Sequence, residues 1–319
     1  MSILKFQIEG RELTWPLSIV KLSHEKEDNK LSTKNTDKPY IMIPNAIVRN
    51  NGISNMSKMI YTSLAMSRNI NQTRLFQQTS INGLLGLVGF KQRTENQNMA
   101  KQGLIELKEL NIISIYSDLA LSKEIKPIYL KGSTMFFVKF NNDFVYSEEF
   151  LSRFEDEEID KELINSGFTY TTVYIDDAVE LFTFESKYSR ANIISFYLMT
   201  VSRALIGDKG DKYSTEKIES ITKYANINEK TVSTYISALF DSKLLFKLTL
   251  REITKTGEIR DHNVYSRWCE RDNITWTIES NDWFMNKTLF KIGDKELSEA
   301  ERNYLKNKSR KLHGLSEIY

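Results

Sequence analysis

Residues that build metal sites, disulfides and nucleophilic catalysts are scarce in this sequence. It has one cysteine, Cys269, and three histidines, His24, His262 and His313, in 319 residues. A single cysteine cannot close an internal disulfide, and the scattered histidines form neither an HExxH motif nor the paired histidines of a metal-dependent nicking enzyme. Cys269 stands beside Trp268 with no base nearby in the sequence, so we expect it in the core and not as a nucleophile.

Other catalytic motifs are missing as well. Gly83, Gly86 and Gly89 recur every third residue, but no Lys-Ser/Thr pair follows them as in a phosphate-binding loop, so a tightly packed short helix explains them better. Asp176 and Asp177 have no partner motif for a metal and suit a helix start. We therefore expect a protein that is not an enzyme and that uses no cofactor and no metal.

Long hydrophobic runs are also absent. Glu9, Arg11 and Glu12 interrupt the first apolar stretch, and no later run approaches the length needed to cross a membrane. The hydrophobic content of 40% is still sufficient for a buried core. We expect a soluble, cytoplasmic protein without membrane contact.

Charge is distributed unevenly, although the net charge is only +2. Residues 1–140 carry an excess of +8, residues 141–187 an excess of −10, and residues 188–319 an excess of +4. Two basic modules joined by an acidic connector are typical of a nucleic-acid-binding protein built from two units. Ordinary surface charge with one acidic loop accounts for the same numbers equally well.

Hydrophobic spacing in the first half predicts helices followed by strands. Apolar residues recur at helical spacing over 54–68, a capping pair at Thr79-Ser80 opens a short helix, and Thr94 and Gln97 form a possible capping box for a helix that ends at Leu110. The apolar runs 112–116 and 135–140 are the expected strands, and Asn111 suits the left-handed residue that closes the helix. This order is that of a winged helix.

The same order recurs downstream, and it forms an internal repeat. Helices are expected over 188–205, after the capping pair Ser214-Thr215, and over 229–242, followed by strands at 244–253 and 264–268 with a wing at Thr254–His262 between them. The apolar residues of the two halves match at a single offset of 132 residues.

These patterns predict a mainly α fold with small antiparallel β wings, arranged as two tandem winged-helix domains. The predicted organisation is a flexible N-terminal arm (1–40), winged-helix domain 1 (41–140), an acidic connector with a strand (141–187), winged-helix domain 2 (188–277) and a basic C-terminal tail (278–319).

Forked and cationic side chains gather where a winged helix contacts the major groove, at the start of the third helix. Amide side chains can pair with adenine, arginine with guanine, and lysine with phosphate. Only Glu95 is acidic within 91–102, although any solvated helix start can be polar. The second module offers smaller hydroxyls, and its wing offers two cations or is an ordinary hairpin. The candidate DNA-binding residues are Lys91, Gln92, Arg93, Thr94, Asn96, Gln97, Asn98, Lys101, Asn228, Lys230, Thr231, Ser233, Thr234, Ser237, Lys255 and Arg260.

Several segments between 40 and 275 resemble a known group of proteins. YIMIPNAIVRN, SNMSKMIYTSLAMS and the pattern Leu104-x-x-Leu107-x-x-Leu110-Asn-Ile-Ile resemble the N-terminal winged helix of RepA_N-type replication initiators of Gram-positive plasmids and phages. ESKYSRANIISFYL resembles the C-terminal winged helix of initiators that have two such domains. The resemblance implies binding to repeated origin sequences in double-stranded DNA, self-association on that DNA, and recruitment of a host helicase or helicase loader.

Two other functions fit the same patterns. A winged-helix transcriptional regulator would bind an operator with the same modules, and a replisome adaptor would use them to dock proteins. The polar face at 91–102 argues against the adaptor.

Overall fold

A computed structural model describes residues 3–8, 11–16, 38–70, 76–153, 170–184, 188–205, 212–272, 274, 277 and 287–318. Contacts divide the chain into two units, Met1–Pro39 and Tyr40–Tyr319. In the first unit β1 (Ile3–Ile8) pairs antiparallel with β2 (Arg11–Pro16). The expected flexible arm, 1–40, thus contains a strand pair, and its residues 17–37 lie outside the described residues.

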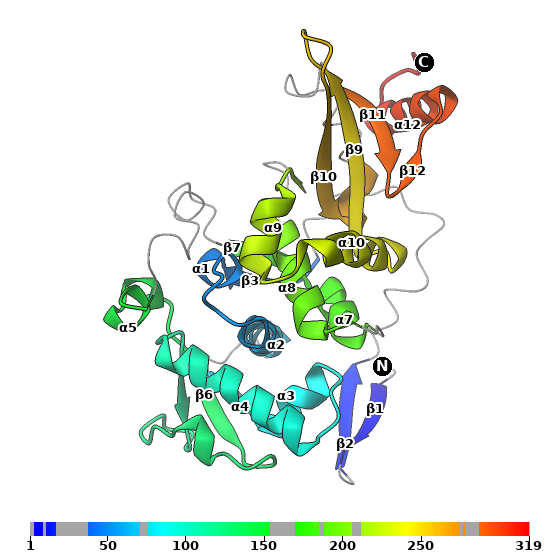
Figure 1. The fold of residues 1–319 in the computed structure, drawn as a ribbon. Helices are drawn as coiled ribbons and strands as arrows, with labels where there is room; N and C mark the ends of the chain where they lie inside the picture. The colour runs from blue at the N-terminus through cyan, green and yellow to red at the C-terminus, as the bar shows by residue number, and fades with distance from the viewer. Residues whose placement is uncertain are drawn as a thin grey trace. The chain divides into compact units, whose positions relative to one another are not determined.

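Most of the second unit consists of two repeats with one order of elements (Figure 1). Each repeat runs strand, helix, longer helix, strand, two helices, two strands. Repeat 1 contains β3 (Tyr40–Pro44), α1 (Asn45–Val48), α2 (Asn55–Ile70), β4 (Phe76–Thr79), α3 (Ile81–Leu87), α4 (Thr94–Glu109), β5 (Ile113–Tyr116) and β6 (Phe136–Phe140). Repeat 2 contains β7 (Tyr170–Tyr174), α7 (Ile175–Thr183), α8 (Arg190–Thr200), β8 (Tyr213–Ser214), α9 (Ile218–Ala225), α10 (Val232–Asp241), β9 (Leu245–Ile253) and β10 (Ile259–Arg267).

The predicted offset of 132 residues is confirmed at the ends of α4 and α10. Asn111 and Lys243 lie 132 positions apart and both have left-handed backbones, with φ of 54° and 57°. The amide of the following residue donates to a carbonyl of the helix in each case, at 2.9 Å for Ile112 and 3.0 Å for Leu244. These bonds satisfy the last carbonyls of both helices and turn the chain into β5 and β9.

Equivalent elements of the repeats face each other. β3 and β7 pair antiparallel with Met42 opposite Thr172 at the centre, so a local two-fold axis relates the two strands. α2 packs against α8 (Figure 1). Nine of the eleven residues of α8 are buried, as expected for a helix that is apolar all round. One cluster of buried apolar side chains extends through both repeats, and the predicted division into domains at 41–140 and 188–277 stays a prediction.

The expected fold class is wrong. The structure is 47% helical and 22% strand, with antiparallel sheets of two, three and five strands in the second unit. It is therefore a mixed α and β protein and not a mainly α protein with small wings. The sequence analysis missed β4 and β8, which are short, and the pairing of β3 with β7, because that pairing joins segments 130 residues apart.

The largest sheet owes its size to the C-terminal part of the chain. β11 (Lys287–Ile292) pairs with β9, and β12 (Lys295–Glu296) extends the sheet, giving the order β12-β11-β9-β10-β8. The expected basic tail instead contains these strands and α12 (Glu299–Leu312), which begins with a capping box between Ser298 and Glu301. The shorter elements are η2 (Pro127–Tyr129), η3 (Phe144–Tyr146), α5 (Glu148–Leu151), η4 (Glu229–Thr231) and η5 (Trp268–Glu270).

Two predicted helix starts are also wrong. The N-cap of α4 is Arg93, which has no side-chain acceptor, and Thr94 is already the first helical residue, so the expected capping box of Thr94 with Gln97 does not form; the side-chain amide of Gln97 instead donates to Asn82. Ser214 lies in β8, and α9 begins later, after Lys217. In both places a tertiary contact takes the side chain or backbone that local capping would have used.

Other local predictions are confirmed. Ser80 caps α3 by accepting from the amide of Gly83 at 3.0 Å, and Asn111 closes α4 with a left-handed backbone. Asp176 and Asp177 lie in the first turn of α7, as expected for acidic residues at a helix start. The acidic connector contains η3, α5, β7 and α7, and its residues 154–169 lie outside the described residues.

Candidate nucleic-acid interface

The start of α4 presents polar and cationic side chains to solvent. Thr94, Asn98 and Gln102 are exposed at four-residue spacing along one stripe of the helix. Lys91 and Arg93 are exposed in the segment just before the helix. Because the N-terminus of a helix carries partial positive charge, this stripe and the two cations form a site that attracts phosphate.

Other polar residues of this segment hold the local structure together. The side-chain amide of Asn96 donates to the carbonyl of Lys91 at 2.7 Å, and the amide of Gln97 donates to Asn82 Oδ1 of α3 at 2.9 Å. Gln92, Asn96 and Gln97 are all half-buried. They therefore fix how the segment leaves α3 and enters α4, while Arg93, Thr94 and Asn98 remain accessible.

The loop between β5 and β6 lies along α4 and adds cations to the same surface. Lys108, near the end of α4, pairs with Glu124 at the start of the loop. At the other end of the loop, the backbone N–H of Asn82 in α3 donates to the carbonyl of Gly132 at 2.9 Å. A Cβ on Gly132 would lie 2.5 Å from the Gln97 side-chain amide, so the loop comes very close to α4 at this residue. The loop therefore runs from the end of α4 back to its start and carries exposed Lys126 and Lys131.

The sequence analysis did not identify Lys126 and Lys131. In the sequence alone, two lysines in a loop look like ordinary solvated residues. The close approach at Gly132 is the signal that could have suggested them, but it is visible only in three dimensions.

The equivalent surface of repeat 2 has fewer cations, and more of its polar side chains are hydrogen-bonded within the protein. Asn228 accepts from the amide of Lys230 at 2.9 Å, and Thr231 donates back to the Asn228 carbonyl at 2.6 Å. Ser237 donates to the carbonyl of Ser233 at 3.0 Å and contacts Asp294 at 3.3 Å. Lys230 and Ser233 remain exposed, and Thr234 is half-buried.

The predicted wing is a β-hairpin in which only the turn is irregular. β10 starts at Ile259, so the last four residues of the expected wing, 259–262, are strand, and the turn is confined to 254–258. Lys255 and Arg260 are exposed, and Arg260 pairs with Glu258 at 2.7 Å, which lowers the pKa of that carboxyl through the hydrogen bond. The structure therefore places Lys255 and Arg260 together at the hairpin tip, on a different element from the cations of α4.

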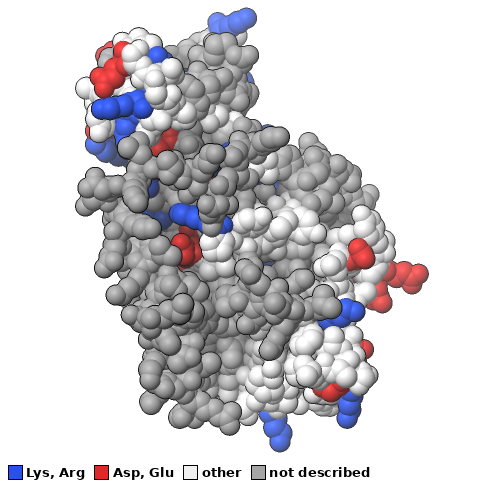
Figure 2. All heavy atoms as spheres, turned by 180° about the vertical axis from the view of Figure 1, so that it is seen from behind, with Lys and Arg blue, Asp and Glu red and all other residues white. Residues whose placement is uncertain are grey.

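Cations on the face seen in Figure 2 do not form one broad patch. Over the described part of that surface, Lys and Arg side chains stand singly or beside acidic ones.

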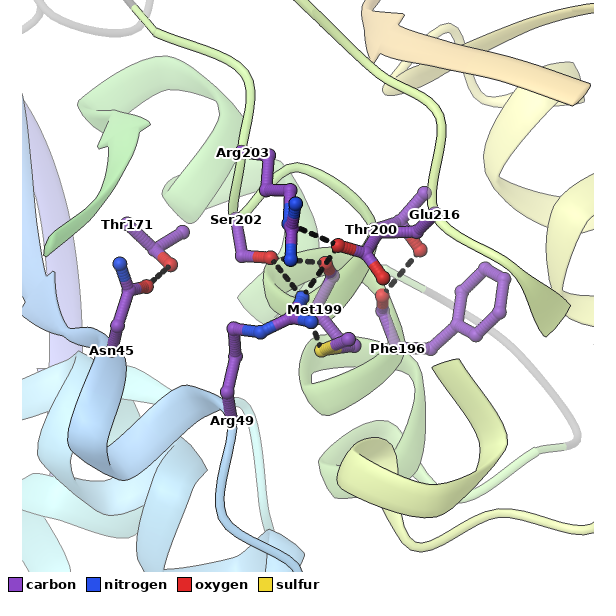
Figure 3. A network of polar contacts seen from close by, with 9 residues as sticks. All are labelled: Asn45, Arg49, Thr171, Phe196, Met199, Thr200, Ser202, Arg203 and Glu216. Carbon is purple, nitrogen blue, oxygen red and sulfur yellow. Dashed lines mark hydrogen bonds and ion pairs between the residues drawn. The ribbon is translucent and has the colours of Figure 1, made fainter. Parts of the chain in front are cut away.

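A buried polar joint fixes repeat 1 to repeat 2 (Figure 3). The guanidinium of Arg49 is 1% exposed and donates to Glu216 and to Ser202 Oγ, both at 2.9 Å. Arg203, which is partly exposed, also pairs with Glu216 at 2.7 Å. The carboxylate of Glu216 thus lies between two guanidinium groups, only one of which reaches solvent.

Two further cations cross this joint in a reciprocal way. Lys58 of α2 donates to the carbonyl of Tyr224, at the end of α9, at 2.5 Å. Arg190 of α8 donates to the carbonyl of Val88, at the end of α3. Each repeat therefore supplies a cation to the C-terminal end of a helix in the other, where the helix dipole favours positive charge.

Burial of Lys58 changes its acid–base behaviour. Loss of hydration lowers the pKa of its ammonium to about 7, and the charge of Glu106 opposes that shift. Glu106 belongs to α4 and accepts from Ser54 Oγ at 2.5 Å and from Ser57 at the start of α2. The side chains at this joint thus link α4 through α2 to repeat 2.

None of the described helices is both long and apolar enough to cross a membrane. Within the described ranges no three His, Cys, Asp or Glu side chains are grouped as ligands for a metal. No protein-family model matches the chain, and no curated protein matches its sequence.

Proposed function

We propose that this chain binds double-stranded DNA in a sequence-dependent way, with the start of α4 in the major groove. The observation that carries the proposal is the exposed group of Arg93, Thr94 and Asn98 at the N-terminus of a 16-residue helix. Arginine and asparagine are the side chains best suited to bidentate contacts with base edges. The brace formed by Gln97, Asn82 and the Gly132 loop holds this group in place before DNA binds.

Roles divide by chemistry within this surface. Arg93 and Asn98 contact bases, while Lys91, Lys101, Lys126 and Lys131 hold phosphates. The phosphate contacts would thus come from two elements, the start of α4 and the β5–β6 loop that packs against it.

Repeat 2 binds the same DNA molecule. Lys230 and Ser233 supply contacts at the start of α10, and the buried joint at Arg49 and Glu216 keeps the two repeats in a fixed relation. A fixed relation raises affinity because the second contact is made without a further loss of freedom. It also sets the spacing between the two half-sites on DNA.

The biological role that we propose is initiation of plasmid or phage replication in the cytoplasm. The resemblance of residues 40–275 to replication initiators supports it, as does the presence of two candidate DNA-contacting helices in one chain. This role includes binding to repeated origin sites, self-association on them, and recruitment of a host helicase or helicase loader.

Selection from random duplexes tests both levels of the proposal. The full chain is incubated with a random 30-bp library, bound duplexes are sequenced, and affinities are measured by fluorescence anisotropy at several salt concentrations. Repeated copies of one motif support an initiator, and a single palindrome would favour a transcriptional regulator instead. Absence of any enriched motif would refute sequence-dependent binding.

Arg93→Ala tests the proposed contact itself. It should weaken binding to the selected duplex by about 1–3 kcal/mol and leave binding to a scrambled duplex almost unchanged. Lys139→Ala removes an exposed cation from β6 and is the matched control, which should affect neither duplex selectively. Equal losses on both duplexes would show that Arg93 does not contact bases.

A further inference from the structure

Two isoleucines are exposed at the tip of the β9–β10 hairpin, opposite each other. Ile253 is 68% exposed and Ile259 is 60% exposed, and the two residues are cross-strand partners. β8 pairs only with Tyr265 and Ser266, and β11 reaches only as far as Glu252. The turn and its two isoleucines therefore extend beyond both neighbouring strands (Figure 1).

Packing does not explain this apolar pair. Alternation places Leu248, Leu250 and Val264 on the face that is buried beneath the hairpin. Ile253 and Ile259 belong to the opposite face, where the next cross-strand pair is Arg251 with Asp261. The pair after that, Thr249 with Asn263, is polar as well, and threonine would serve strand formation near the tip as well as isoleucine does.

The tip is rigid before it meets any partner. The amides of Gly257 and Glu258 donate to the backbone and side-chain oxygens of Thr254 at 2.9 and 3.0 Å, and Gly257 supplies the positive φ of 81° that the turn requires. Below the tip, Arg251 pairs with Asp261 at 2.8 Å across the strands. A stiff two-stranded ribbon thus holds both isoleucines at its end.

We propose that this tip is an apolar wedge that enters the minor groove of DNA, partly unstacks a base step and bends the duplex. The inference rests on the proposed DNA binding and adds DNA deformation to it. Isoleucine is one of the side chains that proteins use as such wedges, and bending lets the duplex contact more of the protein. Lys255 is exposed at the turn beside the isoleucines, and Arg260, which pairs with Glu258, adds a second cation on the other face of the hairpin, so both edges of the tip can meet phosphates.

The experiment compares two double variants of the full chain. Ile253→Thr/Ile259→Thr keeps the β-branched side chains but removes most of the apolar surface. Ile253→Val/Ile259→Val keeps the β-branched shape and the apolar surface. Bending is measured by energy transfer between dyes at the ends of the duplex selected by the wild-type chain. Urea unfolding midpoints of both variants verify that the hairpin region is intact.

The wild-type chain and the valine variant should shorten the end-to-end distance, and the threonine variant should not. The threonine variant should bind a fully paired duplex about tenfold more weakly than the wild-type chain does. Its affinity should return to the wild-type value on a duplex made flexible by a two-base mismatch, because the cost of unstacking is then removed. Equal bending by all three proteins, or a straight duplex in the wild-type complex, would overturn the wedge while DNA binding stands.

Two other outcomes would also overturn it. Loss of self-association in the threonine variant, measured by sedimentation without DNA and with bending unchanged, would assign the tip to contacts between copies of the chain. Failure of the wild-type chain to bind any duplex would remove the proposed function together with the wedge.

Discussion

Replacing Glu216 with alanine should lower the free energy of unfolding by about 3–5 kcal/mol. The magnitude follows from burial, since the side chain of Arg49 is 1% exposed and that of Glu216 is 5% exposed. Glu216→Ala removes the carboxylate from the buried Arg49 guanidinium, whose remaining neighbours include Ser202 Oγ and the sulfur of Met199. Neither neighbour carries the negative charge that offsets desolvation of the guanidinium.

We expect this loss of stability because Glu216→Ala leaves a buried positive charge on Arg49 without its carboxylate. The ion pair itself contributes little net stability compared with apolar side chains in the same place. The double variant Arg49→Met/Glu216→Met removes both charges and fills the space with apolar groups. It should recover most of the lost stability and lie within about 1–2 kcal/mol of the wild type, because well-packed apolar residues can replace a buried pair. Glu258→Ala breaks the exposed pair with Arg260 and is the matched control, with no measurable change expected.

The measurement is urea unfolding followed by tryptophan fluorescence, with midpoint and slope compared among the four proteins. The DNA affinity of each variant is measured below its unfolding transition. A Glu216→Ala effect as small as that of Glu258→Ala would refute the argument that the joint is held by a desolvated pair. A double variant as unstable as the single one would show that packing, and not charge, carries the cost.

Further predictions concern the site and the joint. Lys58→Met removes an ammonium whose pKa is about 7 in the folded chain and 10.5 when unperturbed. Between pH 7 and 10.5 the unfolded wild-type chain binds the extra proton, so wild-type stability should rise relative to the variant by about 1.4 kcal/mol per pH unit and level off above that range. A flat difference in urea midpoint across this range would contradict the prediction. Lys101→Ala should reduce the slope of log affinity against log salt by about one unit, and an unchanged slope would exclude a phosphate contact. Gln97→Ala should lower the free energy of unfolding by about 1 kcal/mol through loss of its bond to Asn82, as well as weakening DNA binding; an unchanged urea midpoint would show that the bond does not brace α4. After proteolytic cleavage in 154–169, the two halves should remain associated in gel filtration, because β3–β7 pairing and α2–α8 packing cross the cut; separation of the fragments would show that these contacts are weak.

Local rules were sufficient where the signal is carried by neighbouring residues. The helix starting near Asn55, the cap at Ser80 and the left-handed residue Asn111 all follow from spacing and capping chemistry. The repeat offset of 132 was also visible, because equivalent apolar residues fill equivalent positions in the two cores.

The candidate site was visible only in part. The polar start of α4 could be predicted, because Lys91, Arg93 and Asn98 are close in sequence and lack an acidic counterweight except Glu95. The cations of the β5–β6 loop could not, because they reach α4 through a contact at Gly132 that is remote in sequence.

The sequence by itself determined the two repeats, their helices and the polar stretch that opens α4, since each depends on residues within a few turns of one another. Only the tertiary structure decided which strands pair, that the C-terminal segment enlarges the second sheet, and that Arg49 and Lys58 are buried between the repeats. The burial of a cation can be predicted only when its partner is known, and Glu216 lies 167 residues from Arg49 in the sequence. Burial and pairing across such distances depend on how whole elements pack, which periodicity along the chain does not encode.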